Sequence, residues 1–133
     1  MKTFVDTSAP YALIVTEDRF HAASGKILSR LEQCSATLLS TSFVMQETVS
    51  LLQARQGIPA VRSFHSRLLP LLDIVWIDAP LYGRAMAALL ASASRRVSLT
   101  DWSSFEVMRL HGIDDAFAFD LHFQEHGFRL LEP

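Results

Sequence analysis

Short hydrophobic runs alternate along the chain with longer segments whose hydrophobic residues recur at helical spacing. Five runs are rich in residues that suit strands, at positions 4–5, 37–41, 72–77, 116–119 and 128–131. Helical spacing predicts helices at positions 9–14, 22–32, 43–56, 60–69, 79–94 and about 100–111. Strands separated by helices throughout indicate an α/β fold, in which helices cover both faces of a parallel sheet.

Capping residues and prolines set several of the predicted boundaries. Ser42 is expected to cap the third helix and Asp78 the fifth, because both side chains can accept a hydrogen bond from a helix N-terminus. Pro70 is expected to end the fourth helix. The sixth helix is expected to begin at Ser98 or Thr100.

Length and composition indicate one globular domain over residues 1–133. Half of the residues are hydrophobic and a fifth are charged, which excludes a disordered chain. The formal net charge is -2, and ten of the twelve basic residues are arginine. Arginine binds phosphates and carboxylates alike through its planar guanidinium. Any nucleic-acid surface must therefore be a local patch.

The chain is expected to be soluble and cytoplasmic. Cys34 is the single cysteine, which excludes an intramolecular disulfide and suits a reducing compartment. The start of the chain does not resemble a signal peptide, since its hydrophobic run breaks at Asp6. No hydrophobic run approaches the roughly 20 residues that span a bilayer, so no membrane partner is expected.

Four carboxylates stand where this fold would bring them together. Asp6 follows the first strand, Asp120 follows the fourth, and Asp101 lies in the first turn of the sixth helix. Glu47 falls within the hydrophobic arc of the third helix. Each has an ordinary alternative, as a helix cap, a charge favoured by a helix dipole or the partner of an arginine. All four, however, belong to the same end of the predicted sheet.

The chemistry of such a set points to a divalent cation. Clustered carboxylates repel one another, so at least one pKa should rise when no cation is bound. Oxygen ligands without cysteine or histidine favour magnesium or manganese over zinc. Such a metal can polarise a phosphoryl oxygen and supply hydroxide for in-line attack on a phosphodiester.

Four segments carry a resemblance to a known family. They are residues 5–8 (Val-Asp-Thr-Ser), Glu47 early in the third helix, residues 98–101 followed by 104–105, and residues 118–123 with 127–128. In order and spacing they resemble the PIN-domain ribonucleases, and among them the VapC-like toxins of bacterial toxin–antitoxin pairs. The resemblance covers essentially the whole chain.

This resemblance implies a three-layer α/β/α sandwich with a central parallel sheet, and metal-dependent endonucleolytic cleavage of RNA. It implies that Asp6, Glu47, Asp101 and Asp120 are the catalytic, metal-binding set, with Mg²⁺ or Mn²⁺ as the cofactor. Water activated by the metal would leave a 5′-phosphate and a 3′-hydroxyl. Ser8 matches the hydroxyl near the first aspartate of the family, where it would position water or phosphate.

The chain departs from the family pattern at three places. Ala118 stands where many relatives carry threonine, two residues before Asp120. Asp114 and Asp115 lie upstream and leave open which acid takes the fourth role. Trp102 follows the third acid where smaller residues are common, and either packs in the core or lines the mouth of the site.

Basic and histidine residues near the acids are weaker candidates. Arg95 and Arg96 precede the sixth helix and are candidate contacts for RNA phosphates, with a solvated linker as the equal alternative. His122 and His126 flank the segment after the fourth acid. Histidine is a general-base candidate in many enzymes, but a surface or packing role is favoured for both here.

The resemblance also implies protein partners. In the family, the part of the chain that corresponds to residues 21–69 forms a groove for the C-terminal segment of the antitoxin. The hydrophobic residues of this region are equally explained as core. Homodimers are usual in the family, so a homodimer is expected.

Other functions are compatible with parts of the pattern. A phospho-aspartate at Asp6 would resemble haloacid-dehalogenase-like phosphatases and receiver domains, but these need a late lysine and none follows Lys26. An RNA-processing nuclease that is not a toxin, or an inactive PIN-fold binding module, would keep the fold. The complete acidic set argues against an inactive module, and cleavage with and without metal distinguishes these possibilities.

Overall fold

A five-stranded sheet organises the computed structural model, which describes residues 1–133. The strand order is β3-β2-β1-β4-β5, and every neighbouring pair is parallel. The strands are β1 (Lys2–Val5), β2 (Thr37–Thr41), β3 (Asp73–Val75), β4 (Asp115–Phe117) and β5 (Arg129–Leu130). The helices are α1 (Ser8–Ile14), α2 (His21–Gln33), α3 (Ser42–Gln56), α4 (Ile58–Ser63), α5 (Ala79–Ser92), α6 (Leu99–Leu110) and α7 (His122–Glu125).

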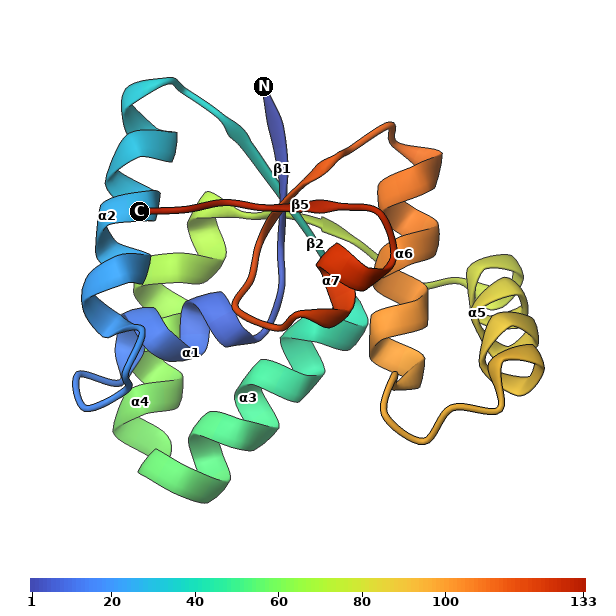
Figure 1. Cartoon of the computed structure of the whole chain (residues 1–133). Coiled ribbons are helices and arrows are strands. Elements are labelled where there is room, and N and C mark those ends of the chain that lie inside the picture. Colours follow the sequence, from blue (N-terminus) through green and yellow to red (C-terminus); the bar gives the residue numbers. More distant parts are fainter.

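Successive residues of the strands face opposite layers of helices. Phe4 of β1 lies beside Leu39 of β2 and Ala116 of β4, and all three belong to a core that includes residues of α5, α6 and α7. The next residue, Val5, packs instead against Ile27 of α2 and other residues of that face. Figure 1 shows α1 and α2 on one side of the sheet and α5 and α6 on the other. The expected three-layer α/β/α sandwich is thus confirmed.

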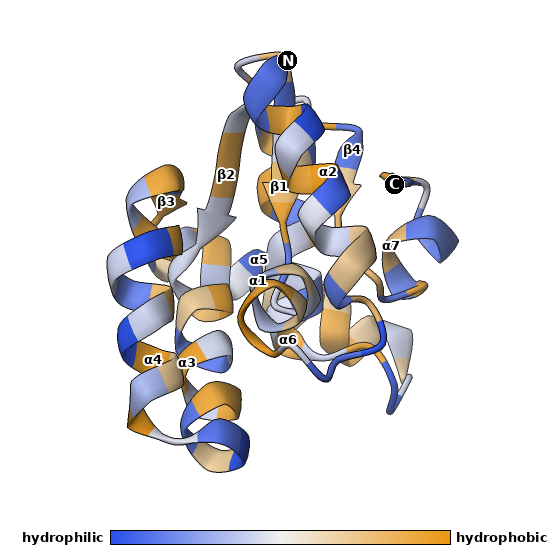
Figure 2. Ribbon diagram, turned by 90° about the vertical axis from the view of Figure 1, so that its left-hand side faces the viewer, coloured by the Kyte–Doolittle hydropathy of each residue, from blue (hydrophilic) through white to orange (hydrophobic).

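Most of the helices bury part of their surface against the sheet or a neighbouring helix, and α4 buries no residue fully. In Figure 2 they mix hydrophilic and hydrophobic residues along their length. A third, smaller cluster of Val15, Leu52 and Phe64 holds α3 against the end of α1 and the π-helical segment Phe64–Leu68 that follows α4. None of the helices is long and apolar enough to cross a membrane.

The position of β1 decides where a site can form. From β1 the chain adds β2 and β3 on one side, and then returns to add β4 and β5 on the other. The order therefore reverses at β1. Open parallel sheets bind their ligands in the crevice at the carboxyl ends of strands at such a reversal. Asp6, the residue directly after β1, lies at this point.

Most predicted boundaries hold, but the cap of α3 is different. Thr41, not Ser42, caps this helix, because its Oγ1 accepts a hydrogen bond from the Val44 N–H at 3.1 Å. The Ser42 hydroxyl instead accepts from the Ile77 N–H at 2.9 Å and ties α3 to the segment after β3. Asp78 caps α5 as predicted, accepting from the backbone N–H three residues later.

Two further elements differ from the prediction. The helix expected to end before Pro70 has α-helical geometry only to Ser63, and Pro70 lies within a 3₁₀ turn, Leu69–Leu71. The fourth strand ends at Phe117 rather than Phe119. The Phe119 N–H donates to the Ser8 hydroxyl at 2.9 Å instead of to a neighbouring strand, so the sheet stops two residues early.

Candidate active site

Asp6 is a buried carboxylate at the end of the central strand, with 5% of its surface exposed. Its backbone N–H donates to the Phe117 carbonyl at 3.1 Å, which extends the pairing of β1 with β4 by one residue. Its Oδ2 accepts from the Ser8 hydroxyl at 3.0 Å. Since Ser8 Oγ also accepts from the Phe119 N–H, this one hydroxyl ties Asp6 to the segment after β4.

The surroundings of Asp6 favour its neutral form. Burial chiefly, together with the charges of Asp101 and Glu47, raises its pKa from 3.8 to about 7. The hydrogen bonds from Ser8 act in the opposite direction. A carboxyl in this state either keeps its proton or needs a nearby cation.

Glu47 reaches the same site from α3. Glu47, Leu51 and Arg55 follow one another at four-residue spacing and line one cavity. Ala54 and Ile58, which lie near Glu47 on a helical wheel, are exposed rather than buried. Glu47 is therefore on the wall of a cavity rather than in the core. Its pKa is raised by burial first, and also by the charges of the third and fourth acids, while two neighbouring threonine hydroxyls lower it.

Asp101 is oriented by the start of α6. The Ser98 hydroxyl accepts from the Asp101 N–H at 3.1 Å, and Asp101 Oδ2 accepts from the Ser98 N–H at 3.1 Å. These two bonds form a capping box, which fixes the first turn of the helix. The side chain is buried, and only Oδ2 is used by the cap.

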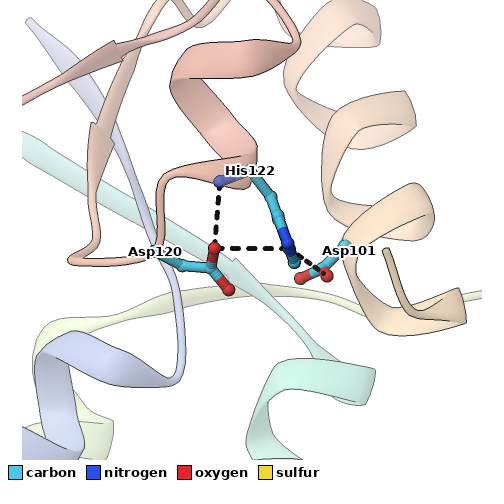
Figure 3. Close-up of side chains that lie close together, drawn as sticks. All are labelled: Asp101, Asp120 and His122. Carbon is cyan, nitrogen blue, oxygen red and sulfur yellow. Dashed lines mark hydrogen bonds and ion pairs between the residues drawn. The ribbon is translucent and has the colours of Figure 1, made fainter. Parts of the chain in front are cut away.

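Asp120 joins the cluster from the loop between β4 and α7. Its Oδ1 accepts from the backbone N–H of His122 at 2.9 Å. The imidazole Nδ1 of His122 lies 3.2 Å from Asp101 Oδ2 and 3.3 Å from Asp120 Oδ1. Figure 3 shows the ring between the two carboxylates. The sequence favoured a surface or packing role for His122, whereas only 15% of its side chain is exposed in the site.

Asp115 has a different partner. Its carboxylate binds the guanidinium of Arg129, with Oδ1 at 2.7 Å from Nε and 2.6 Å from Nη2. It is buried within β4, beside Thr3 of β1, and so lies short of the strand's carboxyl end. The structure brings Asp120, and not Asp115, to Asp101.

The four acids fit a divalent cation. None of the ion pairs in the structure joins a lysine or arginine to any of them, so neither residue type balances their charges. One ligand atom each from Asp101, Asp120 and His122 lie within 4.8 Å of one another. Carboxylate oxygens suit Mg²⁺ and Mn²⁺, and an added imidazole nitrogen is compatible with Mn²⁺.

A cavity of about 360 Å³ opens beside this cluster, and Asp6, Glu47 and Asp120 line it. Arg55 and Tyr11, which no sequence motif indicated, also line it. The Arg55 guanidinium lies over the Tyr11 ring, 5.6 Å from its centroid. The four-residue spacing from Glu47 was the signal that could have identified Arg55.

The remaining candidates lie on the other side of the cluster. Arg96 and His122 line a second pocket together with Trp102 and His126. Arg95 is exposed on the same linker. Trp102 is half-buried and packs edge-on against the rings of Phe105 and His126, so it both packs and lines a pocket. For His126, expected to have a surface or packing role, the structure shows packing, since its ring stacks on Phe105.

Comparisons with known proteins agree with this architecture. The family model for the PIN domain matches residues 3–129. The 23S rRNA-specific endonuclease VapC20 of Mycobacterium tuberculosis is 32% identical over 131 residues, which are 98% of each chain.

Solved structures give the same result. The crystal structure of Mycobacterium tuberculosis VapC20, described as a sarcin-ricin loop cleaving toxin, superposes with a TM-score of 0.85 at 33% identity, covering 98% of this chain and 99% of that one. The crystal structure of VapBC2 from Rickettsia felis, bound to a DNA fragment from its promoter, has a TM-score of 0.72 at 15% identity, covering 98% of both chains. The second likeness is one of fold.

Proposed function

Because the chain belongs to the PIN-domain family, we propose that it is a metal-dependent endoribonuclease, the toxin of a bacterial toxin–antitoxin pair. The family model covers nearly the whole chain, and so does the likeness to an rRNA-specific endonuclease. An inactive binding module is disfavoured because all four acids are present. A nuclease of RNA processing remains the alternative.

One observation carries this proposal. Four carboxylates from β1, α3, α6 and the loop before α7 converge at the carboxyl end of the sheet, and no lysine or arginine is paired with any of them. Buried negative charge without a counter-ion is energetically costly. The raised pKa values of Asp6 and Glu47 reflect this cost. A bound divalent cation would offset this cost, which explains such an arrangement in a metal-dependent active site.

We assign Asp6, Glu47, Asp101 and Asp120 as the residues that hold Mg²⁺ or Mn²⁺. When bound, the metal supplies the positive charge that polarises the scissile phosphate and activates water. The chain itself orients the ligands: Ser8 fixes Asp6, and the capping box fixes Asp101.

Arginines at the rim supply contacts for the RNA backbone. Arg55 lines the cavity of the acids, and Arg96 lines the pocket on the far side of His122. Arg95, exposed on the same linker, is proposed as a further phosphate contact, and Ser8 as a contact for substrate or water. Arginine binds phosphates well through its planar fork.

The substrate class follows from the relatives. Since the relative at 32% identity over 98% of both chains is a 23S rRNA-specific endonuclease, we propose 23S rRNA as the substrate of this chain. The solved structure of that protein is described as cleaving the sarcin-ricin loop, which makes this loop the first RNA to test.

The toxin assignment implies an antitoxin that covers the acidic site. We propose that the groove along residues 21–69 receives it, and that the toxin forms a homodimer. Ile58 in this region, and Trp76 and Leu90 outside it, are large exposed hydrophobic residues that offer surface for the antitoxin and for a second copy. Light scattering of the purified chain, alone and with the candidate antitoxin, tests both.

The decisive experiment is cleavage of ribosomes and of a sarcin-ricin loop oligonucleotide by the purified chain, with Mg²⁺ or Mn²⁺ and then with chelator. We expect a single cut in 23S rRNA that needs metal. Asp101→Asn should slow cleavage about a thousandfold or more, because a metal ligand contributes several kcal/mol to the transition state. Cuts in another RNA would change the substrate only. A folded protein that binds Mn²⁺ and cleaves no RNA would overturn the proposal.

A further inference from the structure

We propose that His122 is a positioning residue of the metal site. Its ring fixes the positions of the Asp101 and Asp120 carboxylates relative to each other and leaves one oxygen of each directed toward the cation. The inference rests on the proposed function, since it concerns the same four acids. It goes beyond that function because it assigns a role to a residue outside the acidic set.

The hydrogen on His122 is placed by its neighbours. Nδ1 lies 3.2 Å from Asp101 Oδ2 and 3.3 Å from Asp120 Oδ1, and a carboxylate oxygen is an acceptor. Nδ1 must therefore carry the hydrogen, which it donates to Asp101 Oδ2, while Asp120 Oδ1 lies in close contact with the same nitrogen. A single N–H thus links α6 to the loop after β4. The two acids that these elements carry, Asp101 and Asp120, are 19 residues apart in sequence.

The carboxylate oxygens divide into two kinds. Asp101 Oδ2 accepts from the Ser98 N–H and also faces Nδ1 of His122. Asp120 Oδ1 accepts from the His122 N–H and also faces Nδ1. The other oxygen of each side chain has no hydrogen-bond partner within the protein. In Figure 3 these two oxygens carry no dashed line and lie in the space between the carboxylates. They are the ones left for a cation.

The helix that carries the imidazole, α7, is itself fixed by contacts with its neighbours. The His122 carbonyl accepts from Nδ1 of His126 at 2.8 Å, and the His126 ring stacks on Phe105 of α6, with centroids 4.7 Å apart. Phe123, the neighbour of His122 in α7, is fully buried in the same core. The short helix α7 is therefore anchored to α6 on both sides of the imidazole, as a rigid support for metal ligands should be.

The test compares three substitutions at this position by their affinity for Mn²⁺, measured from the electron paramagnetic resonance of the free ion. His122→Leu removes the donor. His122→Asn keeps an amide N–H near the place of Nδ1, whereas His122→Gln moves it one bond further out. We expect Leu and Gln to weaken Mn²⁺ binding about 10-fold to 100-fold, the usual loss for a residue that orients metal ligands, and Asn to retain most of the affinity.

Controls separate this role from others. His65→Leu, at an exposed histidine outside the site, should leave the affinity unchanged. Thermal unfolding in chelator should show that the variants are folded, and the Asn and Gln pair remains informative if Leu does not fold. Pulsed resonance of bound Mn²⁺ should show no coupling to an imidazole nitrogen.

Two results would overturn the inference. One is equal Mn²⁺ affinity in the wild type, Leu and Gln variants, which would leave His122 without a role. The other is a nitrogen coupling that His122→Leu abolishes, which would make His122 a direct ligand. Failure of the proposed function is recognised separately, because the wild type itself would then bind no Mn²⁺ or cleave no RNA.

Discussion

The buried carboxyl of Asp6 makes the metal-free protein sensitive to pH. Its pKa is 3.8 when unfolded and about 7 when folded. Between these values the folded chain holds a proton that the unfolded chain has lost, so the free energy of unfolding falls as the pH rises from about 4 to about 7. Above pH 7 the loss from this group is complete.

Asp6→Asn should remove this penalty. In chelator at pH 8 we expect the variant to be more stable than the wild type by roughly 2–4 kcal/mol, since one pKa unit corresponds to about 1.4 kcal/mol. At pH 4 the two proteins should be similar. Denaturant unfolding at both pH values measures this. The raised pKa of Glu47 lowers the stability of both proteins as the pH rises, and does so less in the variant, where the charge of Asp6 no longer repels it. If the difference in the free energy of unfolding between the two proteins were the same at pH 4 and pH 8, a raised pKa for Asp6 would be excluded.

Ser8→Ala should shift the pH dependence of cleavage. The Ser8 hydroxyl stabilises the ionised form of Asp6, so its loss raises the pKa of Asp6 further and lets protons compete with the cation at higher pH. We expect the acid limb of the rate profile to move to higher pH and cleavage at pH 6 to fall several-fold. Ser8→Thr, which keeps a hydroxyl, is the control. An unchanged acid limb would assign Ser8 a role apart from Asp6.

At the residue scale, the sequence predicted the acids better than their surroundings. Asp6 and Asp120 could be placed because each directly follows a hydrophobic run, although the second run extends beyond the end of β4. His122 was not recognised, since its role depends on the contact of its ring with Asp101 of α6, 21 residues earlier in sequence. Asp115 was left open for the same reason, because its partner Arg129 comes from β5.

At the element scale, the cap of α6 links stability to the site. Ser98→Ala should lower the free energy of unfolding by about 1 kcal/mol, the usual cost of an N-cap, and should also weaken Mn²⁺ binding, because the first turn carries Asp101. Asp78→Ala is the matched control, since it uncaps α5 at Leu81 away from the acids. Denaturant unfolding and Mn²⁺ titration of both variants test this. If the two variants changed the Mn²⁺ affinity equally, the cap of α6 would have no specific effect on the metal site.

Element boundaries were predictable where a local signal decides them. Asp78 and Ser98 cap their helices as expected, because a cap needs only the backbone three residues ahead. Ser42 failed as a cap because Thr41 precedes it and the Ser42 hydroxyl is used by the distant Ile77. The fourth strand was predicted too long at Phe119, whose N–H bonds to Ser8 from the other end of the chain.

At the scale of the whole molecule, a net charge of -2 offers no general attraction for RNA. The sheet places the acids at the carboxyl end of β1, so the RNA backbone must be brought to a negative site. The arginines at the rim, Arg55 and Arg96, are the groups in position to offset this repulsion. Affinity should therefore depend on a few local phosphate contacts rather than on the surface as a whole.

The salt dependence of RNA binding tests this view. Each phosphate contact on single-stranded RNA contributes about 0.7 to the slope of log affinity against log salt, so Arg96→Gln should reduce that slope by about this amount. Arg30→Gln is the control, because Arg30 of α2 lines a pocket beside Met1 at the opposite end of β1. Binding is measured with the Asp101→Asn protein, which should not cleave the RNA. If both arginine variants reduce the slope equally, the RNA is attracted by the surface as a whole, and the rim is not its binding site.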